Sequence, residues 1–184
     1  MVEVISERGR TDAVITTDLE LIEQVRSGNE EAFARLVKHY TPYVYRTAFA
    51  FLHDEHESED VAQEIFLKVY RSIQELQDIL AFNAWIKRIT TNSCLDRLRK
   101  QRPTPVPDHQ LNQIMGKNSQ KGEQLLEIKE AISQLIPEYR EALILREWQG
   151  YDYQEIATLL SIPLGTVKSR IHGARVRLRK ILSE

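Results

Sequence analysis

Two clusters of lysine and arginine give the clearest chemical signal in this sequence. One extends from Lys87 to Arg102 and the other from Lys168 to Lys180, whereas an acidic cluster extends from Asp54 to Glu64. Guanidinium and ammonium groups gathered on a helix suit the phosphates of a nucleic acid. Segregated charge of this kind predicts one surface for an anion such as DNA and another surface for a different partner.

The second basic cluster follows a pattern typical of a helix-turn-helix. Asp152 and Glu155 can cap a short helix, Ser161 and Ile162 can make a tight turn, and Pro163 suits the start of a second helix. In this layout the second helix enters the major groove of DNA. The alternative is a basic, solvated helix of an interaction module, which we disfavour because the cap, the turn and the basic flanks agree.

An apolar stripe on that second helix defines which side chains can reach DNA. At about 100° per residue, the buried face holds Val167, Ile171, Ala174, Leu178 and Ile181. The opposite face holds Gly165, Lys168, Ser169, His172, Gly173 and Val176. Of these, we expect Lys168, Ser169 and His172 to reach base edges. Flanking side chains that suit phosphates are Arg170, Arg175, Arg177, Arg179 and Lys180.

The first basic cluster lies on a helix expected from about Phe82 to Lys100. The side chains expected to contact phosphates are Lys87, Arg88, Arg97, Arg99, Lys100 and Arg102. Asn83 and Asn92 are expected to hydrogen-bond bases. Trp85 shares a face with the apolar residues of this helix, so a core position is favoured over a stacking platform for bases.

The acidic cluster begins a helix expected from about Glu57 to Leu76. Its buried face holds Val61, Ala62, Ile65, Phe66, Val69 and Ile73, and its other face presents Asp60, Gln63, Glu64, Leu67, Arg71 and Gln74. Single exposed leucines are common on proteins. Taken alone, Leu67 therefore leaves a partner surface and a plain solvated face equally open.

One segment of the sequence offers candidate metal ligands. His53, His56, Glu57 and Asp60 could be metal ligands at helical spacing, but acids at a helix start interact with its dipole, and we favour that interpretation. No glycine-rich phosphate loop follows a strand, and no Ser-His-Asp or Cys-His arrangement is apparent. The single Cys94 excludes an intramolecular disulfide. We expect no enzyme, no metal and no cofactor.

All of these clusters lie on expected helices, and the predicted fold class is all-α. Further helices are expected from a capping box at Thr17 to near Gly28, from Asn29, and from Pro42. Three prolines between 103 and 107 then break regular structure. The predicted organisation is a flexible leader at 1–17, a helical domain at 18–102, a flexible linker at 103–122 and a helix-turn-helix domain at 123–184.

Composition places the chain among globular proteins. Hydrophobic residues make up 42% of its 184 residues and charged residues 28%. No apolar run approaches the ~20 residues of a membrane span. The first sixteen residues lack the apolar stretch of a signal peptide. We therefore expect a cytoplasmic protein with no membrane insertion.

The C-terminal segment carries a family resemblance. The sequence YDYQEIATLLSIPLGTVKSRIHGARVRLRK resembles the promoter-reading helix-turn-helix of the extracytoplasmic-function (ECF) sigma factors, within the sigma-70 family, and LIPEYREALILREWQGYDYQEIA resembles the helix before it. The resemblance implies recognition of the minus-thirty-five element through Thr166, Lys168, Ser169, Arg170, His172, Gly173 and Arg175. Family members often carry arginine at the position of Gly173.

The N-terminal segment resembles the same family. DVAQEIFLKVY is similar to the segment that docks on the clamp helices of the polymerase's largest subunit, which implies that Asp60, Gln63, Glu64 and Leu67 bind polymerase. FNAWIKRITTNSCLDRLRK resembles the helix that reads the downstream promoter element. The loop from about Gln74 to Ala81 aligns with the loop that captures an unstacked base in relatives.

The resemblance implies a sigma factor that directs core RNA polymerase to promoter DNA and assists promoter opening. It also implies an anti-sigma factor as an inhibitory partner and a role in a stress response. The main alternative is a stand-alone helix-turn-helix regulator, which would explain the segment from Tyr151 to Lys180 equally well. It would not explain the acidic helix or the second basic helix. A pure interaction adaptor is disfavoured by the two basic surfaces.

Overall fold

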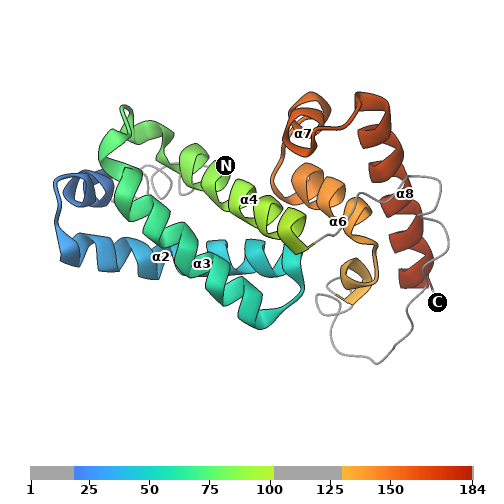
Figure 1. Cartoon of the computed structure of the whole chain (residues 1–184), viewed down its shortest axis with the longest axis horizontal. Helices are drawn as coiled ribbons and strands as arrows, with labels where there is room; N and C mark the ends of the chain where they lie inside the picture. The colour runs from blue at the N-terminus through green and yellow to red at the C-terminus, as the bar shows by residue number, and fades with distance from the viewer. Residues whose placement is uncertain (1–18, 102–129, 184) are drawn as a thin grey trace, which may run out of the picture.

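The computed structural model describes residues 19–101 and 130–183, which form two helical domains (Figure 1). The predicted all-α class is confirmed, since no strand occurs in these two ranges. The predicted leader and linker, and the capping box at Thr17, lie outside the described residues. The N-terminal domain holds a helix at 19–26, α2 (Glu30–Leu52), α3 (Glu55–Ser72), η1 (Ile73–Glu75), η2 (Ile79–Ala81) and α4 (Phe82–Gln101). The C-terminal domain holds α6 (Pro137–Leu143), η4 (Ile144–Trp148), α7 (Tyr153–Leu160) and α8 (Leu164–Ser183).

Local signals set most helix boundaries of the N-terminal domain. Gly28, with a φ of 87°, reverses the chain after the first helix, a backbone conformation that favours glycine. The Asn29 side chain then accepts a hydrogen bond from the Ala32 amide at 2.9 Å and caps α2. Asp54 caps α3 in the same way by accepting from the Glu57 amide. The predicted cap at Asn29 and the predicted helix end near Gly28 are confirmed.

The predicted helix start at Pro42 is wrong, because α2 continues through this residue as one helix of 23 residues. The buried stripe of Leu36, Tyr40, Val44 and Ala48 runs across Pro42 without a change of phase. A proline inside a helix costs about 3 kcal/mol. Pro42 is exposed, so water can satisfy the carbonyl that its missing amide leaves unbonded. Burial of this apolar stripe therefore outweighs the preference of proline for the start of a helix.

The core of the N-terminal domain lies where α2, α3 and α4 pack against one another. Its largest fully buried side chains are Leu36, Val44, Phe51, Ile65, Ile73, Phe82 and Ile86. Trp85 is half-buried, packs against this core and lies 5.7 Å from Phe82 between ring centroids. The core position predicted for Trp85 is confirmed. This packing fixes the exposed faces of α3 and α4 relative to each other.

The C-terminal domain contains the predicted helix-turn-helix. Asp152 and Glu155 form a complete capping box at the start of α7, with reciprocal hydrogen bonds of 2.7 and 2.8 Å. Ser161 ends α7 in the left-handed conformation, and α8 begins directly after Pro163. Val167, Ile171 and Ala174 are buried as expected, whereas Leu178 and Ile181 are half-buried. The apolar stripe therefore presents the opposite face of α8 outward.

The two domains also pack against each other, which the sequence did not predict. One buried apolar cluster includes residues of α2 and of α6, η4, α7 and α8. The Tyr43 hydroxyl donates to Gln149 Oε1 at 2.9 Å, and Gln149 Nε2 donates to Thr47 Oγ1 at 3.3 Å. Arg140 of α6 donates to the Phe51 carbonyl at 3.4 Å. The C-terminal domain therefore packs against the C-terminal half of α2.

Neither a membrane-spanning helix nor a cluster of metal-binding side chains occurs within residues 19–101 and 130–183. Within 19–101 and 130–183, every helix is too short or too polar to cross a membrane. Within the same ranges, no group of three or more histidine, cysteine, aspartate or glutamate side chains could hold a metal ion.

Candidate nucleic-acid interface

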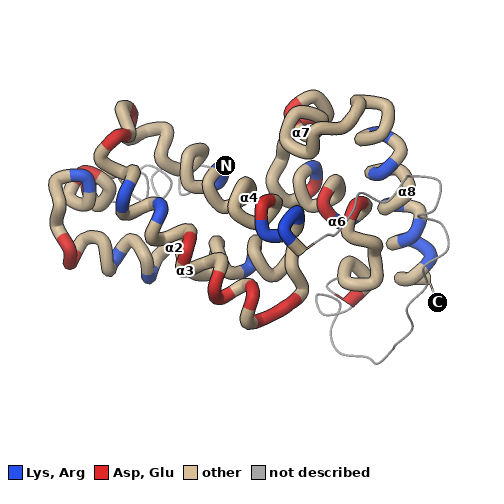
Figure 2. The backbone as a smooth tube through the Cα atoms, in the orientation of Figure 1, with Lys and Arg blue, Asp and Glu red and all other residues tan. Residues whose placement is uncertain are grey.

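The outward face of α8 carries the side chains expected to reach base edges. Lys168, Ser169 and His172 are exposed there, whereas Thr166 and Arg170 are half-buried. The Ser169 hydroxyl donates to the Thr166 carbonyl at 2.9 Å, so its oxygen keeps the capacity to accept a bond. Figure 2 shows basic segments along α8. The helix therefore presents a cation, a hydroxyl and an imidazole on one solvent-facing side.

Arg175, a predicted DNA contact on the flank of α8, is engaged within its own domain. Its Nε donates to Glu147 Oε1 of η4 at 3.2 Å, and its terminal nitrogen forms a salt bridge with the same carboxylate. Both side chains are about half exposed, so this pair contributes little stability. DNA would have to compete with Glu147 for Arg175.

Gly173 does not lie on the solvent-facing side of α8, where the sequence analysis placed it. A Cβ atom built at this position would lie 2.8 Å from the Tyr139 ring of α6. The Arg177 guanidinium also lies over the Tyr139 ring, 5.0 Å from its centroid. The glycine therefore lets α6 and α8 approach closely. This is a packing reason for the glycine that the helical pattern of α8 alone cannot reveal.

Replacing Gly173 with alanine is expected to lower the free energy of unfolding. Alanine favours a helix over glycine by about 1 kcal/mol, but the Tyr139 ring must move to admit the methyl group, and overpacking costs about 1–3 kcal/mol. In a Tyr139→Ala background the same change should stabilise instead, because the obstacle is gone. Urea unfolding of the four variants measures this coupling. A Gly173→Ala effect of the same sign in both backgrounds would contradict the packing role.

The outward face of α4 carries most of the first basic cluster. The exposed side chains expected to contact DNA here are Asn83, Arg88, Asn92, Arg99 and Lys100. Asn83 Oδ1 accepts a hydrogen bond from the Tyr40 hydroxyl at 2.7 Å, which leaves its amino group as the outward donor. Lys87 is half-buried, with its ammonium 4.4 Å from the centroid of the Tyr151 ring.

Arg97 was predicted to contact phosphates, but in the structure it pairs with carboxylates of the same domain. Its guanidinium donates to Glu57 at 2.7 Å and to Glu64 at 2.6 Å, and both carboxylates belong to α3. A forked guanidinium that holds two carboxylates has few donors left for a phosphate. In this structure Arg97 instead joins α4 to α3. The acidic partners are thirty or more residues away in sequence, so helical spacing could not reveal them.

The outward face of α3 brings together the four residues expected to bind polymerase. Asp60, Gln63, Glu64 and Leu67 are all exposed, and the Leu67 side chain is 55% exposed. Tyr70 extends this face and is 52% exposed, with its ring edge against Phe33 at 4.9 Å between centroids. Tyr70 was not among the residues predicted from the sequence to bind polymerase. Its spacing of three residues from Leu67 was the signal that could have found it.

Two family models match the two domains in order. Sigma-70 region 2 matches residues 36–104, and sigma-70 region 4 matches residues 125–178. The chain is 34% identical over 178 residues to the ECF RNA polymerase sigma factor SigW of Bacillus subtilis, covering 89% of this chain and 95% of that protein. The chain belongs to the ECF sigma factors.

Other members of the family agree. The chain is 33% identical over 175 residues to the ECF RNA polymerase sigma-E factor of Escherichia coli, covering 86% of this chain and 91% of that protein. Among solved structures, CnrH in complex with the cytosolic domain of CnrY has a TM-score of 0.56 at 26% identity, covering 90% of this chain and 97% of that chain. The sigma factor RpoE in complex with the anti-sigma factor NepR from Bartonella quintana shares the fold, with a TM-score of 0.54 at 23% identity over 82% of this chain and 96% of that chain.

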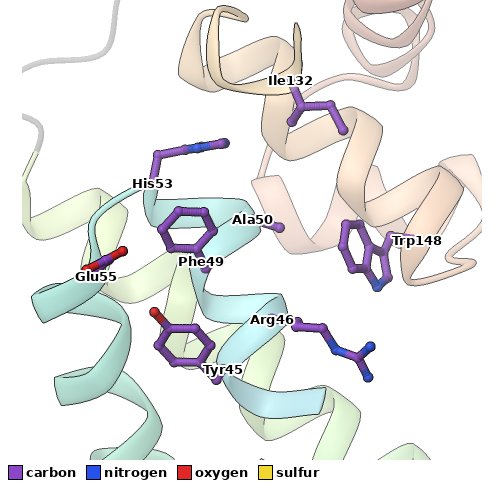
Figure 3. A pocket seen from close by; sticks show the side chains of 8 residues that line it. All are labelled: Tyr45, Arg46, Phe49, Ala50, His53, Glu55, Ile132 and Trp148. Carbon is purple, nitrogen blue, oxygen red and sulfur yellow. The ribbon is translucent and has the colours of Figure 1, made fainter. Parts of the chain in front are cut away.

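A cavity of about 240 Å³ separates part of the two domains of this sigma factor. Figure 3 shows Tyr45, Phe49 and His53 on the side of α2, and Ile132 and Trp148 on the side of the C-terminal domain. His53 ends α2 in the left-handed conformation, with a φ of 53°. Its Nε2 is buried without a hydrogen-bond partner. Burial, and secondarily the charge of Arg140, lower the pKa of His53 to about 4.

Replacing His53 with asparagine is expected to flatten the acid side of the stability profile. The unfolded chain takes up a proton at His53 near pH 6.5, whereas the folded chain rejects it until about pH 4. Stability is therefore lost as the pH falls from 6.5 to 4, by less than about 3 kcal/mol from this group, because water partly screens the half-buried imidazole. Asparagine tolerates the left-handed backbone and does not titrate. Urea unfolding at pH 7 and pH 5 tests this; equal losses in both proteins would exclude His53 as the cause.

Proposed function

We propose that this sigma factor directs core RNA polymerase to promoters through a division of labour between its domains, and that it catalyses no reaction itself. The observation that carries the proposal is that three distinct exposed faces coexist on one chain. The exposed residues of α3 include the acidic Asp60 and Glu64 and the apolar Leu67, whereas the exposed charged residues of α4 and α8 are mostly basic. Figure 2 shows basic residues at the C-terminal end of α4 and along α8. A regulator that binds DNA alone has no use for the first of these faces.

The α8 helix is proposed to read the upstream promoter element in the major groove. Lys168, Ser169 and His172 suit base edges, because they are exposed on the side opposite the buried stripe. The proposed phosphate and flanking contacts are Thr166, Arg170, Arg175, Arg177 and Arg179. Gly173 is proposed to act through packing against Tyr139 and not through DNA.

The α4 helix and the loop before it are proposed to hold the downstream element while the duplex opens. Lys87, Arg88, Arg99 and Lys100 suit phosphates, and Asn83 and Asn92 suit bases. In the loop, η1 and η2 leave Leu80 70% exposed, which places an apolar side chain where an unstacked base could rest. Extruding a base costs a few kcal/mol, so such contacts favour opening only when several act together.

The α3 face is proposed to bind core polymerase through Asp60, Gln63, Glu64 and Leu67, with Tyr70 at its edge. Arg97 of α4 donates a hydrogen bond to Glu64 and so helps to fix the position of this side chain. Apolar side chains surrounded by polar ones are the usual centre of protein interfaces, and aromatic residues are enriched there. The protein would act in the cytoplasm, where polymerase and promoter DNA are found.

An anti-sigma factor is proposed as a further partner. CnrH and the RpoE of Bartonella quintana, which resemble this chain in fold, were solved in complex with CnrY and with the anti-sigma factor NepR respectively. A partner of that class would compete with polymerase or DNA for the exposed faces described above. Co-purification of the full chain from its host under non-inducing conditions would identify it.

The binding order of the full chain tests the proposed function. The chain is expected to co-elute with sigma-free core polymerase in gel filtration, and to bind promoter duplex tightly only in that complex. The control is the same duplex with core polymerase alone. Tight, specific duplex binding by the isolated chain, together with no co-elution with core polymerase, would contradict the proposal and favour a stand-alone helix-turn-helix regulator.

A further inference from the structure

We propose that Tyr139 of α6 is part of the upstream DNA interface, where its hydroxyl donates to a backbone phosphate and its ring holds Arg177 against the same phosphate. The proposal rests on the proposed function of α8, and it adds a contact from a helix outside the helix-turn-helix. The two helices pack against each other along the C-terminal domain (Figure 1). No residue of α6 was among those predicted from the sequence to bind DNA.

One flank of α8 carries a row of polar side chains with a gap. Thr166, Arg170, Gly173 and Arg177 follow one another at spacings of three or four residues, so they form one stripe along the helix. A hydroxyl and two guanidinium groups in such a row suit the phosphates of a DNA strand. Glycine contributes no side chain to this row. The phosphate contact expected from the third position is therefore missing from α8 itself.

The hydroxyl end of Tyr139 fills that gap. A Cβ atom built on Gly173 would lie 2.8 Å from both Cε2 and Cζ of Tyr139, and 2.9 Å from its hydroxyl oxygen. The far end of the ring therefore covers the α8 backbone at Gly173. Tyr139 is half-buried, so part of its side chain is open to solvent. Because a phenol hydroxyl can donate to a phosphate oxygen, α6 supplies the donor that the row of α8 lacks.

The same ring holds a cation beside the hydroxyl. The Arg177 guanidinium lies 5.0 Å from the centroid of the Tyr139 ring, within the range of a cation–π interaction. Stacking uses the flat face of a guanidinium, whereas hydrogen bonds to a phosphate use the N–H groups at its edge. Tyr139 can therefore act twice at one phosphate, as a donor and as a positioning residue for Arg177.

The other flank of α8 is arranged differently. There Arg175 donates to the Glu147 carboxylate of η4, so a phosphate would have to displace an anion before it reaches the guanidinium. On the Tyr139 flank, the side chain that reaches α8 from the preceding helix carries a neutral donor, which a phosphate can accept from directly. We therefore place the stronger phosphate contacts on the Tyr139 flank.

The first test removes only the hydroxyl. The holoenzyme, formed from the full chain and core polymerase, is titrated with a promoter duplex obtained by mapping transcript starts. Tyr139→Phe keeps the ring over Gly173 and beside Arg177, so urea unfolding should be unchanged while the affinity for the duplex falls by roughly 5- to 10-fold. The matched control is Tyr45→Phe, which removes the same atom from a half-buried tyrosine of α2 and should leave the affinity unchanged.

Variants of Arg177 separate the charge from its positioning. Arg177→Ala should lower the affinity by roughly tenfold and reduce the slope of log affinity against log salt concentration by about one. Tyr139→Phe should leave that slope unchanged, because the hydroxyl carries no charge. Arg177→Lys should restore the slope but not the full affinity, since an ammonium group lacks the flat face that stacks on a ring.

A duplex with single methylphosphonate substitutions identifies the phosphate. Methylphosphonate is neutral and lacks one acceptor oxygen, so at the contacted position the unaltered protein should lose affinity. On that duplex Tyr139→Phe and Arg177→Ala should cause no further loss, because the group that both side chains contact is already gone. The account of one shared contact requires the same position for both variants.

Two results would overturn this inference. One is an unchanged duplex affinity of Tyr139→Phe, and the other is a loss in either variant that no methylphosphonate cancels, as expected for a contact to a base. Co-elution with core polymerase is measured alongside. If the isolated chain binds the duplex tightly and does not co-elute, the proposed function fails, and the same variants measured on the isolated chain still decide the role of Tyr139.

Discussion

Leu67→Glu is expected to weaken binding to core polymerase by at least about a hundredfold while leaving the fold intact. Burying a leucine at an interface contributes about 1.5–3 kcal/mol, and a buried carboxylate without a partner adds a further penalty. The side chain is 55% exposed in the free chain, so its replacement removes little from the core. Fluorescence titration of labelled sigma factor with core polymerase measures the loss.

The matched control for this prediction is Leu182→Glu. Leu182 is 51% exposed and lies near the end of α8, in the other domain. Both variants add one negative charge at a half-exposed leucine, so only the position differs. Equal affinities of the two variants for polymerase would show that the α3 face does not form the interface.

Lys168→Ala is expected to reduce use of the upstream promoter element by about 10- to 100-fold without affecting polymerase binding. A well-placed contact to a base edge contributes about 1–3 kcal/mol of discrimination. Lys168 is exposed on the outward face of α8, one residue after the buried Val167, so alanine there does not disturb the helix packing. Transcription by the reconstituted holoenzyme from promoters with intact and scrambled upstream elements measures the effect.

Arg179→Ala is the comparison that separates base recognition from phosphate contact. Arg179 is exposed near the end of α8, away from the proposed base-reading side chains. Its loss should lower transcription from both templates by the same factor. It should also reduce the slope of log affinity for DNA against log salt concentration by about one. If Lys168→Ala also lowered transcription from both templates by the same factor, Lys168 would be a phosphate contact and not a specificity determinant.

Local signals were enough to predict much of this fold. Caps at Asn29 and at Asp152 with Glu155, and the apolar stripe of α8, depend on residues within a few positions of each other, so sequence spacing reveals them. The prediction at Pro42 was wrong because the preference of proline for a helix start competes there with burial of the apolar stripe of α2. That burial stabilises the helix only in the packed core.

The candidate site was predictable only as far as exposure follows from helical periodicity. The α3 face and the exposed face of α8 were found in this way. Arg97 and Gly173 were not, since their partners Glu57, Glu64 and Tyr139 lie on other helices. Docking between the domains depends on the pairing of Tyr43 with Gln149, more than a hundred residues apart, which no periodicity encodes.

Mapping of transcript starts tests whether this chain selects promoters. Sigma-free core polymerase would transcribe host genomic DNA with and without this protein. We expect new starts that require the protein, that share sequence elements upstream, and that are lost with Leu67→Glu. No protein-dependent starts from an active core preparation would contradict the assignment of promoter selection to this chain.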